Sequence, residues 1–267
     1  MTTHFAACGL CLEPKELRDS HLLPRALYKQ SRDSTGGADP NPVVITQSKT
    51  ITSSQQVSSY FLCESCEQRF SDNGERYVVA QCARSDGSFK LREQILAASP
   101  LHDTPKFKVY DVQSLLDSKI DHYLYFAASI FWRASAHRWK MGAEPVGQIS
   151  LGDKYEEQFR LYLVGKAALP KNARLHVHVS SEAQSDLMST VFPCTTRIDK
   201  ARRHQFYIPG LLFLLFLSGD VSREIDNGAL NGSLMQVVWL CPWENEALFR
   251  GSMEVIKSSR PSGKLRR

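Results

Sequence analysis

Cys8-Gly9-Leu10-Cys11 and Cys63-Glu64-Ser65-Cys66 are the two stretches that determine how the N-terminal part of this chain is built. Each is a Cys-x-x-Cys knuckle, a tight turn that supplies two sulfur ligands. Two such knuckles provide the four thiolates of a tetrahedral structural zinc site. We therefore predict one zinc ion bound by four cysteines: Cys8, Cys11, Cys63 and Cys66.

A redox or disulfide role is the alternative for these cysteine pairs. Redox-active Cys-x-x-Cys motifs open a helix in a thioredoxin-like βαβ unit, and the sequence around neither pair has that pattern. The other three cysteines, Cys82, Cys194 and Cys241, are widely spaced. We expect them to be buried and to behave as small apolar residues.

The composition is that of an ordinary globular protein. The chain has 267 residues, of which 42% are hydrophobic and 23% are charged, which suggests one or two domains with a substantial core. The net charge of +5 permits a nucleic-acid partner without requiring one.

The sequence predicts a soluble, cytoplasmic protein with no membrane contact. The N-terminus has no basic stretch followed by an apolar core of signal-peptide length. The longest apolar run, from Tyr207 to Leu217, is interrupted by Pro209 and Gly210. It is much shorter than the roughly 20 residues that cross a bilayer.

We predict an α+β fold in four segments. Residues 1–85 carry the knuckles and form a zinc-binding domain, and residues 86–111 are a linker region containing two prolines. Residues 112–256 form a larger α+β domain of unknown function. Residues 257–267 are a basic, disordered tail, because they are poor in apolar residues.

The larger domain is predicted to combine a long amphipathic helix with antiparallel strands. Apolar residues recur at three- and four-residue steps from Val112 to Trp139, which predicts one helix. A second helix is predicted over 155–165, ending at Gly165. Alternating or continuous apolar residues predict strands at 175–179, 205–218 and 235–241.

Two further helical features bear on function. A helix is predicted to begin near Cys66, to break at 71–74 and to resume over 75–82. Arg133, with basic neighbours, lies near the end of the helix predicted over 112–139. These cations either meet a phosphate backbone or simply complement the negative end of the helix dipole, and the second is the more usual case.

Between the knuckles lies Ser20-His21-Leu22-Leu23-Pro24. The order of knuckle, Ser-His-Leu-Leu-Pro and Leu-Cys-x-x-Cys-Glu resembles the HNH nucleases, also called ββα-metal or treble-clef nucleases. The resemblance covers roughly residues 5–80. It implies an N-terminal treble-clef zinc module and a metal-dependent endonuclease acting on DNA, in bacterial defence or in a mobile element.

The resemblance also assigns roles to individual residues. His21 matches the general base that takes a proton from the attacking water, a role that suits an imidazole. Glu67 takes the place of the family's final histidine. It would bind a catalytic Mg²⁺ or Mn²⁺ ion, and Glu75 is a second candidate ligand. The zinc ion would be structural.

The sequence departs from the family pattern at two other positions. Ser20 replaces the carboxylate that often precedes the base, and Ser58 stands where the family has asparagine. These changes keep an alternative open: a non-catalytic zinc module that binds nucleic acid or a protein partner. Under either hypothesis the chain could form a homodimer or act with a partner protein.

Overall fold

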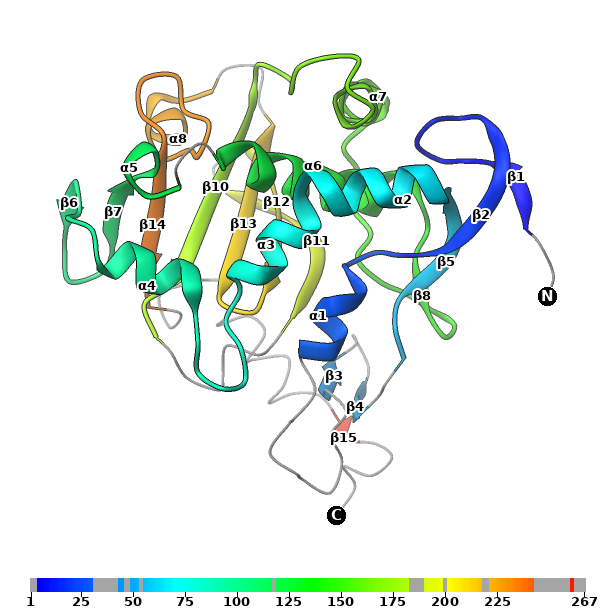
Figure 1. Cartoon of the computed structure of the whole chain (residues 1–267), viewed down its shortest axis with the longest axis horizontal. Coiled ribbons are helices and arrows are strands. Elements are labelled where there is room, and N and C mark those ends of the chain that lie inside the picture. The colour runs from blue at the N-terminus through cyan, green and yellow to red at the C-terminus, as the bar shows by residue number, and fades with distance from the viewer. Residues whose placement is uncertain are drawn as a thin grey trace.

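A seven-stranded mixed sheet forms the largest element of the computed structural model (Figure 1). The structure describes residues 4–30, 43–45, 49–52, 55–116, 119–182, 190–198, 201–217, 221–242 and 260–261. These residues form several sheets and helices, which confirms the predicted α+β class. In order across the large sheet the strands are β11 (Val191–Ile198), β12 (Ala201–Ile208), β13 (Leu211–Leu217), β10 (Ala173–Ser180), β14 (Val237–Cys241), β7 (Lys108–Asp111) and β6 (His102–Asp103).

Neighbouring strands of this sheet run antiparallel, as predicted, except that β10 and β14 pair in parallel. Strand β13 reads Leu-Leu-Phe-Leu-Leu-Phe-Leu, and its first five residues are buried. A continuous apolar run of this kind is typical of a strand that is covered on both faces.

The helix predicted over 112–139 is divided into α5 (Val112–Leu116) and α6 (Ile120–Ala136). Helix α6 ends because His137 adopts an extended conformation, and the indole of Trp139 donates a hydrogen bond of 2.8 Å to the carbonyl of Arg133. Most residues of α6 are buried on all sides, which is typical of a helix between two packed layers.

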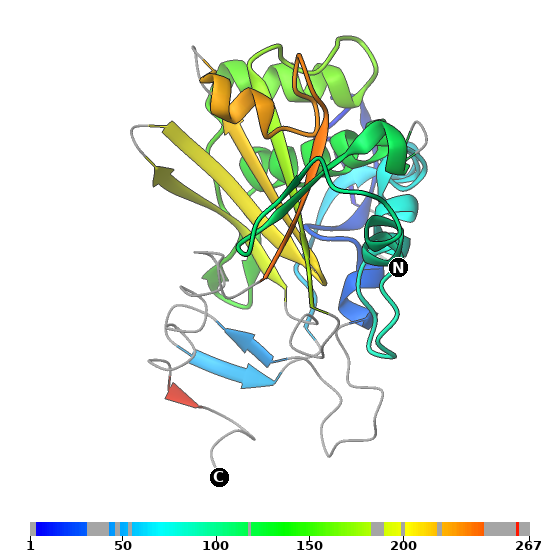
Figure 2. The same cartoon turned by 90° about the vertical axis from the view of Figure 1, so that its left-hand side faces the viewer.

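Helix α6 lies between the large sheet and the part of the chain that carries the two cysteine pairs. This cysteine-bearing part consists of the described residues 4–30 and 55–81. Figure 2 shows helices gathered along one face of the sheet. On the sheet side, Phe126 and Phe131 of α6 contact Phe206 of β12. On the other side, Trp132 contacts Phe61 and Phe70 of the cysteine-bearing part. One continuous hydrophobic core therefore joins the two parts.

The segment predicted as a linker is built into the fold. Residues 86–111 contain α4 (Lys90–Leu96) and strands β6 and β7. Strand β7 pairs with β14, with Val109 opposite Trp239. The region predicted as a linker therefore contains regular structure, because short strands next to Pro100 and Pro105 are paired into the sheet edge. Their local composition does not reveal this pairing.

The cysteine-bearing part has its own three-stranded antiparallel sheet, followed by consecutive helices. The predicted break at 71–74 is absent, because residues Ser71–Glu75 form a π-helical turn that joins α2 to α3 without interruption. A Cβ atom at Gly74 would lie 2.8 Å from the backbone nitrogen of Phe126 in α6. Glycine is thus required for the close approach of α6 and does not end the helix. The elements are β1 (Phe5–Ala7), β2 (Pro14–His21), α1 (Arg25–Gln30), β5 (Ser58–Cys63), α2 (Glu64–Phe70), η1 (Ser71–Glu75) and α3 (Arg76–Gln81).

The helix predicted over 155–165 is confirmed, with Gly165 in the left-handed region after its end at φ 77°. The predicted disordered tail lies largely outside the described residues; its described residues, Arg260 and Pro261, pair with β4 (Lys49–Thr52). No helix in the described ranges combines the length and apolar character needed to cross a membrane. The remaining elements are β3 (Val43–Ile45), β4 (Lys49–Thr52), β8 (Lys140–Met141), β9 (Glu144–Pro145), α7 (Asp153–Leu163), α8 (Arg223–Asn227) and β15 (Arg260–Pro261).

Candidate metal centre

The two cysteine pairs meet at one point. The first pair lies in the turn between β1 and β2, while Cys63 ends β5 and Cys66 lies in the first turn of α2. The four Sγ atoms all lie within 4.8 Å of one another, and those of Cys11 and Cys63 are 3.9 Å apart. A tetrahedral site with Zn–S bonds of about 2.3 Å would place its sulfurs about 3.8 Å apart. The predicted residues are therefore positioned to hold a metal ion.

The turn that carries the first pair depends on its glycine. The N–H of Gly9 donates a hydrogen bond of 2.9 Å to the carbonyl of Phe61. A Cβ atom at Gly9 would lie 2.1 Å from the ring of Phe61. The knuckle therefore packs directly onto β5, which brings it to the second pair.

The electrostatics of the four thiols favour a bound cation. A hydrogen bond from Cys66 lowers the pKa of Cys8, although burial opposes this. The same hydrogen bond, together with burial, raises the pKa of Cys66. The backbone N–H of Cys63 also donates to the Cys8 sulfur at 3.3 Å. Four thiolates this close would repel one another unless a cation neutralised them.

The three remaining cysteines lie outside this cluster. Cys82 and Cys241 are buried and Cys194 is half-buried. Burial raises the pKa of Cys82 and of Cys194, which keeps these thiols protonated and unreactive.

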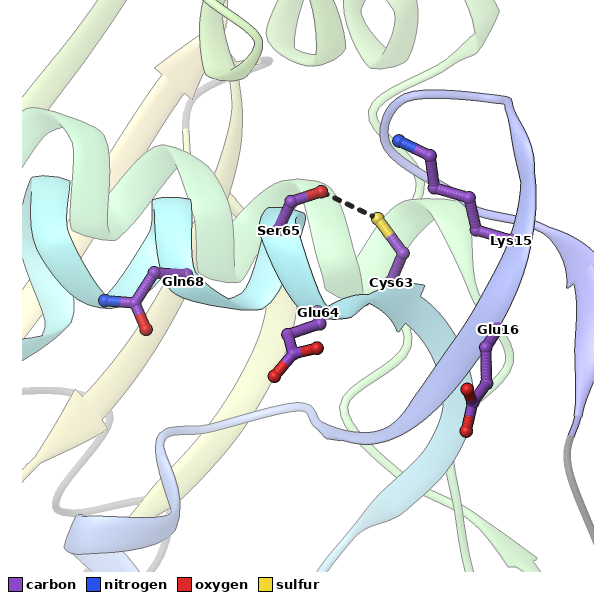
Figure 3. A pocket seen from close by; sticks show the side chains of 6 residues that line it. All are labelled: Lys15, Glu16, Cys63, Glu64, Ser65 and Gln68. Carbon is purple, nitrogen blue, oxygen red and sulfur yellow. Dashed lines mark hydrogen bonds between the residues drawn. The ribbon is translucent and has the colours of Figure 1, made fainter.

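A surface pocket lined by Cys63 lies at the four-cysteine cluster, as Figure 3 shows. In it the Cys63 sulfur lies 3.3 Å from the hydroxyl of Ser65. The pocket does not include His21 or Glu67, so it opens on the cysteine centre and not on the predicted reaction site. Its lining residues are Lys15, Glu16, Cys63, Glu64, Ser65 and Gln68.

His21 is the last residue of β2 and is half-buried. Its Nε2 atom lies 2.6 Å from the side-chain oxygen Oε1 of Gln56. With the amide oxygen of Gln56 as the acceptor, Nε2 is the donor in this contact and carries the ring proton. In the neutral ring Nδ1 then carries the lone pair, and within the described part of the chain nothing is bonded to it.

Glu67 lies on α2 next to the second knuckle, and its Oε1 atom is buried without a hydrogen-bond partner among the described residues. Burial raises the pKa of this carboxyl, and the charge of Glu75 adds to the effect. The positive charge of Arg133, the hydroxyl of Ser20 and the charge of His21 oppose it in part. The structure thus brings Glu67 into the electrostatic reach of His21 and Glu75.

Ser20 stands where the family often has a metal-binding carboxylate, and its hydroxyl is not available as a metal ligand. Its side chain is fully buried, and its hydroxyl accepts a hydrogen bond of 2.9 Å from the N–H of Leu62. Ser58, which stands where the family has asparagine, pairs with His21 across β2 and β5.

Arg133 differs in its surroundings from what the local sequence suggests. It is not at an exposed basic helix end, because its side chain is only 1% exposed. Its guanidinium forms an ion pair with Glu75 and donates a hydrogen bond of 2.7 Å to the main-chain carbonyl of His21. Glu75, predicted as a metal ligand, is therefore engaged by an arginine. Arg138 and Lys140 do remain exposed.

Two sequence signals could have pointed to the missed residues. Gln56 supplies an amide two positions before Ser58, close to the place of the missing asparagine. Arg133 follows the apolar run Ile130-Phe131-Trp132, and a charge inside such a run is normally paired when buried.

No protein-family model, curated protein or solved structure matches this chain. Functional inference therefore rests on the geometry of these residues.

Proposed function

We propose that this chain is a divergent HNH-type endonuclease that hydrolyses phosphodiester bonds of DNA. The observation that carries the proposal is the ring of His21: Gln56 bonds to Nε2 and leaves Nδ1 as a base, within the electrostatic range of Glu67, whose Oε1 atom has no partner among the described residues. A general base and an acidic side chain that can hold a metal ion are groups that such a reaction uses.

The structural centre is proposed to be a zinc-bound treble clef. A knuckle between two strands, an antiparallel β2–β5 pair and a helix that starts at the second knuckle support this assignment. Four thiolates suit zinc better than a hard cation. The ion would fix the hairpin against α2 and would take no part in the reaction.

In the proposed reaction His21 removes a proton from the water that attacks phosphorus. An imidazole held in one tautomer by a carboxamide is ready to accept this proton on its free nitrogen. The hydrogen bond to Gln56 also limits rotation of the ring, so that Nδ1 keeps one direction. The water oxygen would form a bond to phosphorus as the bond from phosphorus to the leaving oxygen breaks. The leaving oxygen would take up a proton from solvent, and the imidazolium of His21 would return its proton to solvent.

Glu67 is the side chain that would hold a catalytic Mg²⁺ or Mn²⁺ ion. A carboxylate oxygen is a preferred ligand for either ion, and the buried Oε1 has no partner among the described residues. When bound, such an ion stabilises negative charge on the scissile phosphate and the leaving oxygen. Glu75 is less suited than the sequence suggested, because Arg133 already engages its carboxylate.

A plasmid-nicking assay tests this proposal. We expect supercoiled DNA to be cut in Mg²⁺ or Mn²⁺ and the activity to be lost in EDTA. His21→Ala and Glu67→Gln should each lower the rate by at least about 100-fold, because general base catalysis alone contributes about 10²–10⁴-fold.

Matched controls are available on the same chain. His102→Ala removes an exposed histidine of β6, and Glu64→Gln removes an exposed glutamate three residues before Glu67. Both controls should cut at the wild-type rate. Equal cutting by His21→Ala and wild type would remove His21 from the mechanism, and absence of cutting with every metal would refute the proposal.

The second candidate is a non-catalytic zinc module that binds nucleic acid or a protein partner. The ion pair between Arg133 and Glu75 favours it, because a fixed guanidinium already neutralises one of the two predicted ligands. The buried hydroxyl of Ser20 is likewise committed to the main chain. Gel-shift binding that persists without Mg²⁺ and in His21→Ala, together with no cutting, would support this function.

A further inference from the structure

We infer that Arg133 is a positioning residue for His21, acting on the base through the main chain from a helix that lies outside the resembling segment. The inference rests on the proposed nuclease function for its kinetic readout. The structural readout described below does not depend on that function.

The guanidinium of Arg133 contacts Phe70 of α2 and is hydrogen-bonded to Ser129 of its own helix. It lies 4.9 Å from the centre of the Phe70 ring. Its Nε atom donates to the carbonyl of Ser129 at 3.3 Å, and Nη2 donates to the Ser129 hydroxyl at 3.2 Å. The side chain is almost fully buried. A buried, multiply bonded guanidinium is a rigid donor.

From this fixed position Arg133 reaches two segments that carry the candidate site. Nη1 donates to the carbonyl of His21 at 2.7 Å, and Nη2 pairs with the carboxylate of Glu75. Holding the carbonyl of His21 fixes the end of β2, from which the imidazole projects. Gln56 bonds to the imidazole ring, so both the main-chain carbonyl and the ring of His21 are restrained.

Only arginine meets these demands together. Its planar fork presents separate N–H groups to a carbonyl and to a carboxylate, whereas a lysine ammonium is a single point charge. Loss of the fork would free the end of β2 and leave Glu75 without its counter-charge. Small displacements of a catalytic group lower a reaction rate strongly, about 10²-fold for a shift near 1 Å.

Three variants of the full-length chain test the inference. Arg133→Met removes the fork, and Arg133→Lys keeps the charge. Arg160→Met is the matched control: Arg160 of α7 also donates to a main-chain carbonyl of the cysteine-bearing part, that of Leu10, at 2.9 Å. It contacts neither His21 nor Glu75 in any described interaction.

The kinetic arm measures kcat and KM for nicking in Mg²⁺. We expect Arg133→Met to lower kcat about 100-fold, because the base is misaligned. KM should change less than about threefold, because the groups that bind the substrate are unchanged. Arg133→Lys should recover part of this loss, and Arg160→Met should keep the wild-type kcat. A folded Arg133→Met with wild-type kcat would overturn the inference, as would an equal loss in an Arg160→Met protein that keeps its full zinc content, since Arg160 bonds to Leu10 of the first knuckle.

The structural arm measures the tautomer of His21 by ¹⁵N NMR of the imidazole, without any substrate. Wild type and Arg160→Met should show the proton on Nε2, and Arg133→Met should show a mixture of tautomers. If the wild-type chain cuts no DNA, this arm still decides the positioning role. A single Nε2–H tautomer in Arg133→Met would overturn it. If Arg133→Met fails to fold, Arg133→Lys replaces it: wild-type kcat and an unchanged tautomer there would overturn the inference.

Discussion

The buried ion pair between Arg133 and Glu75 should stabilise the fold measurably. Arg133 is 1% exposed and Glu75 is 16% exposed, so removing either partner leaves the other in a poorly solvated site. Breaking a buried pair in this way costs about 3–5 kcal/mol. For comparison, a hydrogen bond to a charged group contributes about 1.5–3 kcal/mol.

The two single substitutions should lower the free energy of unfolding by different amounts. Glu75→Gln keeps an oxygen that can accept from Arg133 and loses only the charge, so we expect a loss of about 2–3 kcal/mol. Arg133→Met also removes the donor to the His21 carbonyl and the contact with the Phe70 ring. We therefore expect it to cost about 3–5 kcal/mol.

The double variant Arg133→Met/Glu75→Gln gives the pairwise energy. The double variant leaves no unpaired charge. Its loss in the free energy of unfolding should therefore be smaller, by about 2 kcal/mol, than the sum of the losses in the two single variants. Urea unfolding of all four proteins measures these free energies of unfolding.

An exposed pair on the same part of the chain provides the control. Arg18 and Glu64 are 2.8 Å apart, with side chains 48% and 78% exposed. Exposed pairs contribute about 0.2–1 kcal/mol, so the cycle Arg18→Met/Glu64→Gln should give a coupling below about 1 kcal/mol. If the two cycles give the same coupling, or if the losses at Arg133 and Glu75 simply add, burial does not strengthen the ion pair.

Three further predictions concern the metal, the carboxyl group and the division of the chain. Cys11→Ser should lower the bound zinc measured by elemental analysis from one ion per chain and lower the Tm, whereas Cys82→Ser, outside the cluster, should retain the metal; equal zinc in both would contradict the four-cysteine site. Because burial raises the pKa of Glu67, the folded chain binds that proton more tightly than the unfolded chain. Ionisation above the folded pKa therefore costs stability, so Glu67→Gln without Mg²⁺ should be more stable than wild type at pH 7. The difference should shrink as the pH falls to about 4, and a pH-independent difference would show that burial does not penalise the ionised carboxyl of Glu67. A fragment of residues 1–85 should give a collapsed amide NMR spectrum even with zinc, because its core continues into α6; a dispersed spectrum would show that it folds alone.

The cysteine centre could be predicted from sequence because its information is local. Each knuckle contains both of its ligands within four residues, and the spacing alone indicates a metal site. The end of α7 was equally readable, since Gly165 adopts the left-handed conformation that glycine favours. These features do not depend on which distant segment packs against them.

The misplaced features depend on contacts between distant segments. Gly74 looked like a helix breaker, yet it admits the backbone of α6 at Phe126. Strand β7 looked like part of a linker, yet β14 pairs with it. In both cases the partner lies far along the chain, and local composition carries no record of it.

The same distinction governs the candidate site. The motif around His21 predicts a base, but its orientation depends on Gln56, and the charge beside it depends on Arg133 from α6. Under the proposed nuclease function Glu67 would be the metal ligand, because its Oε1 atom has no partner among the described residues, whereas Arg133 engages Glu75. If that is so, adding Mg²⁺ should change the signals of Glu67 in ¹³C NMR of the carboxyl groups and leave those of Glu75 unchanged. Equal changes at both carboxylates would show that the ion displaces Arg133, and no change at either would leave the non-catalytic module as the better account.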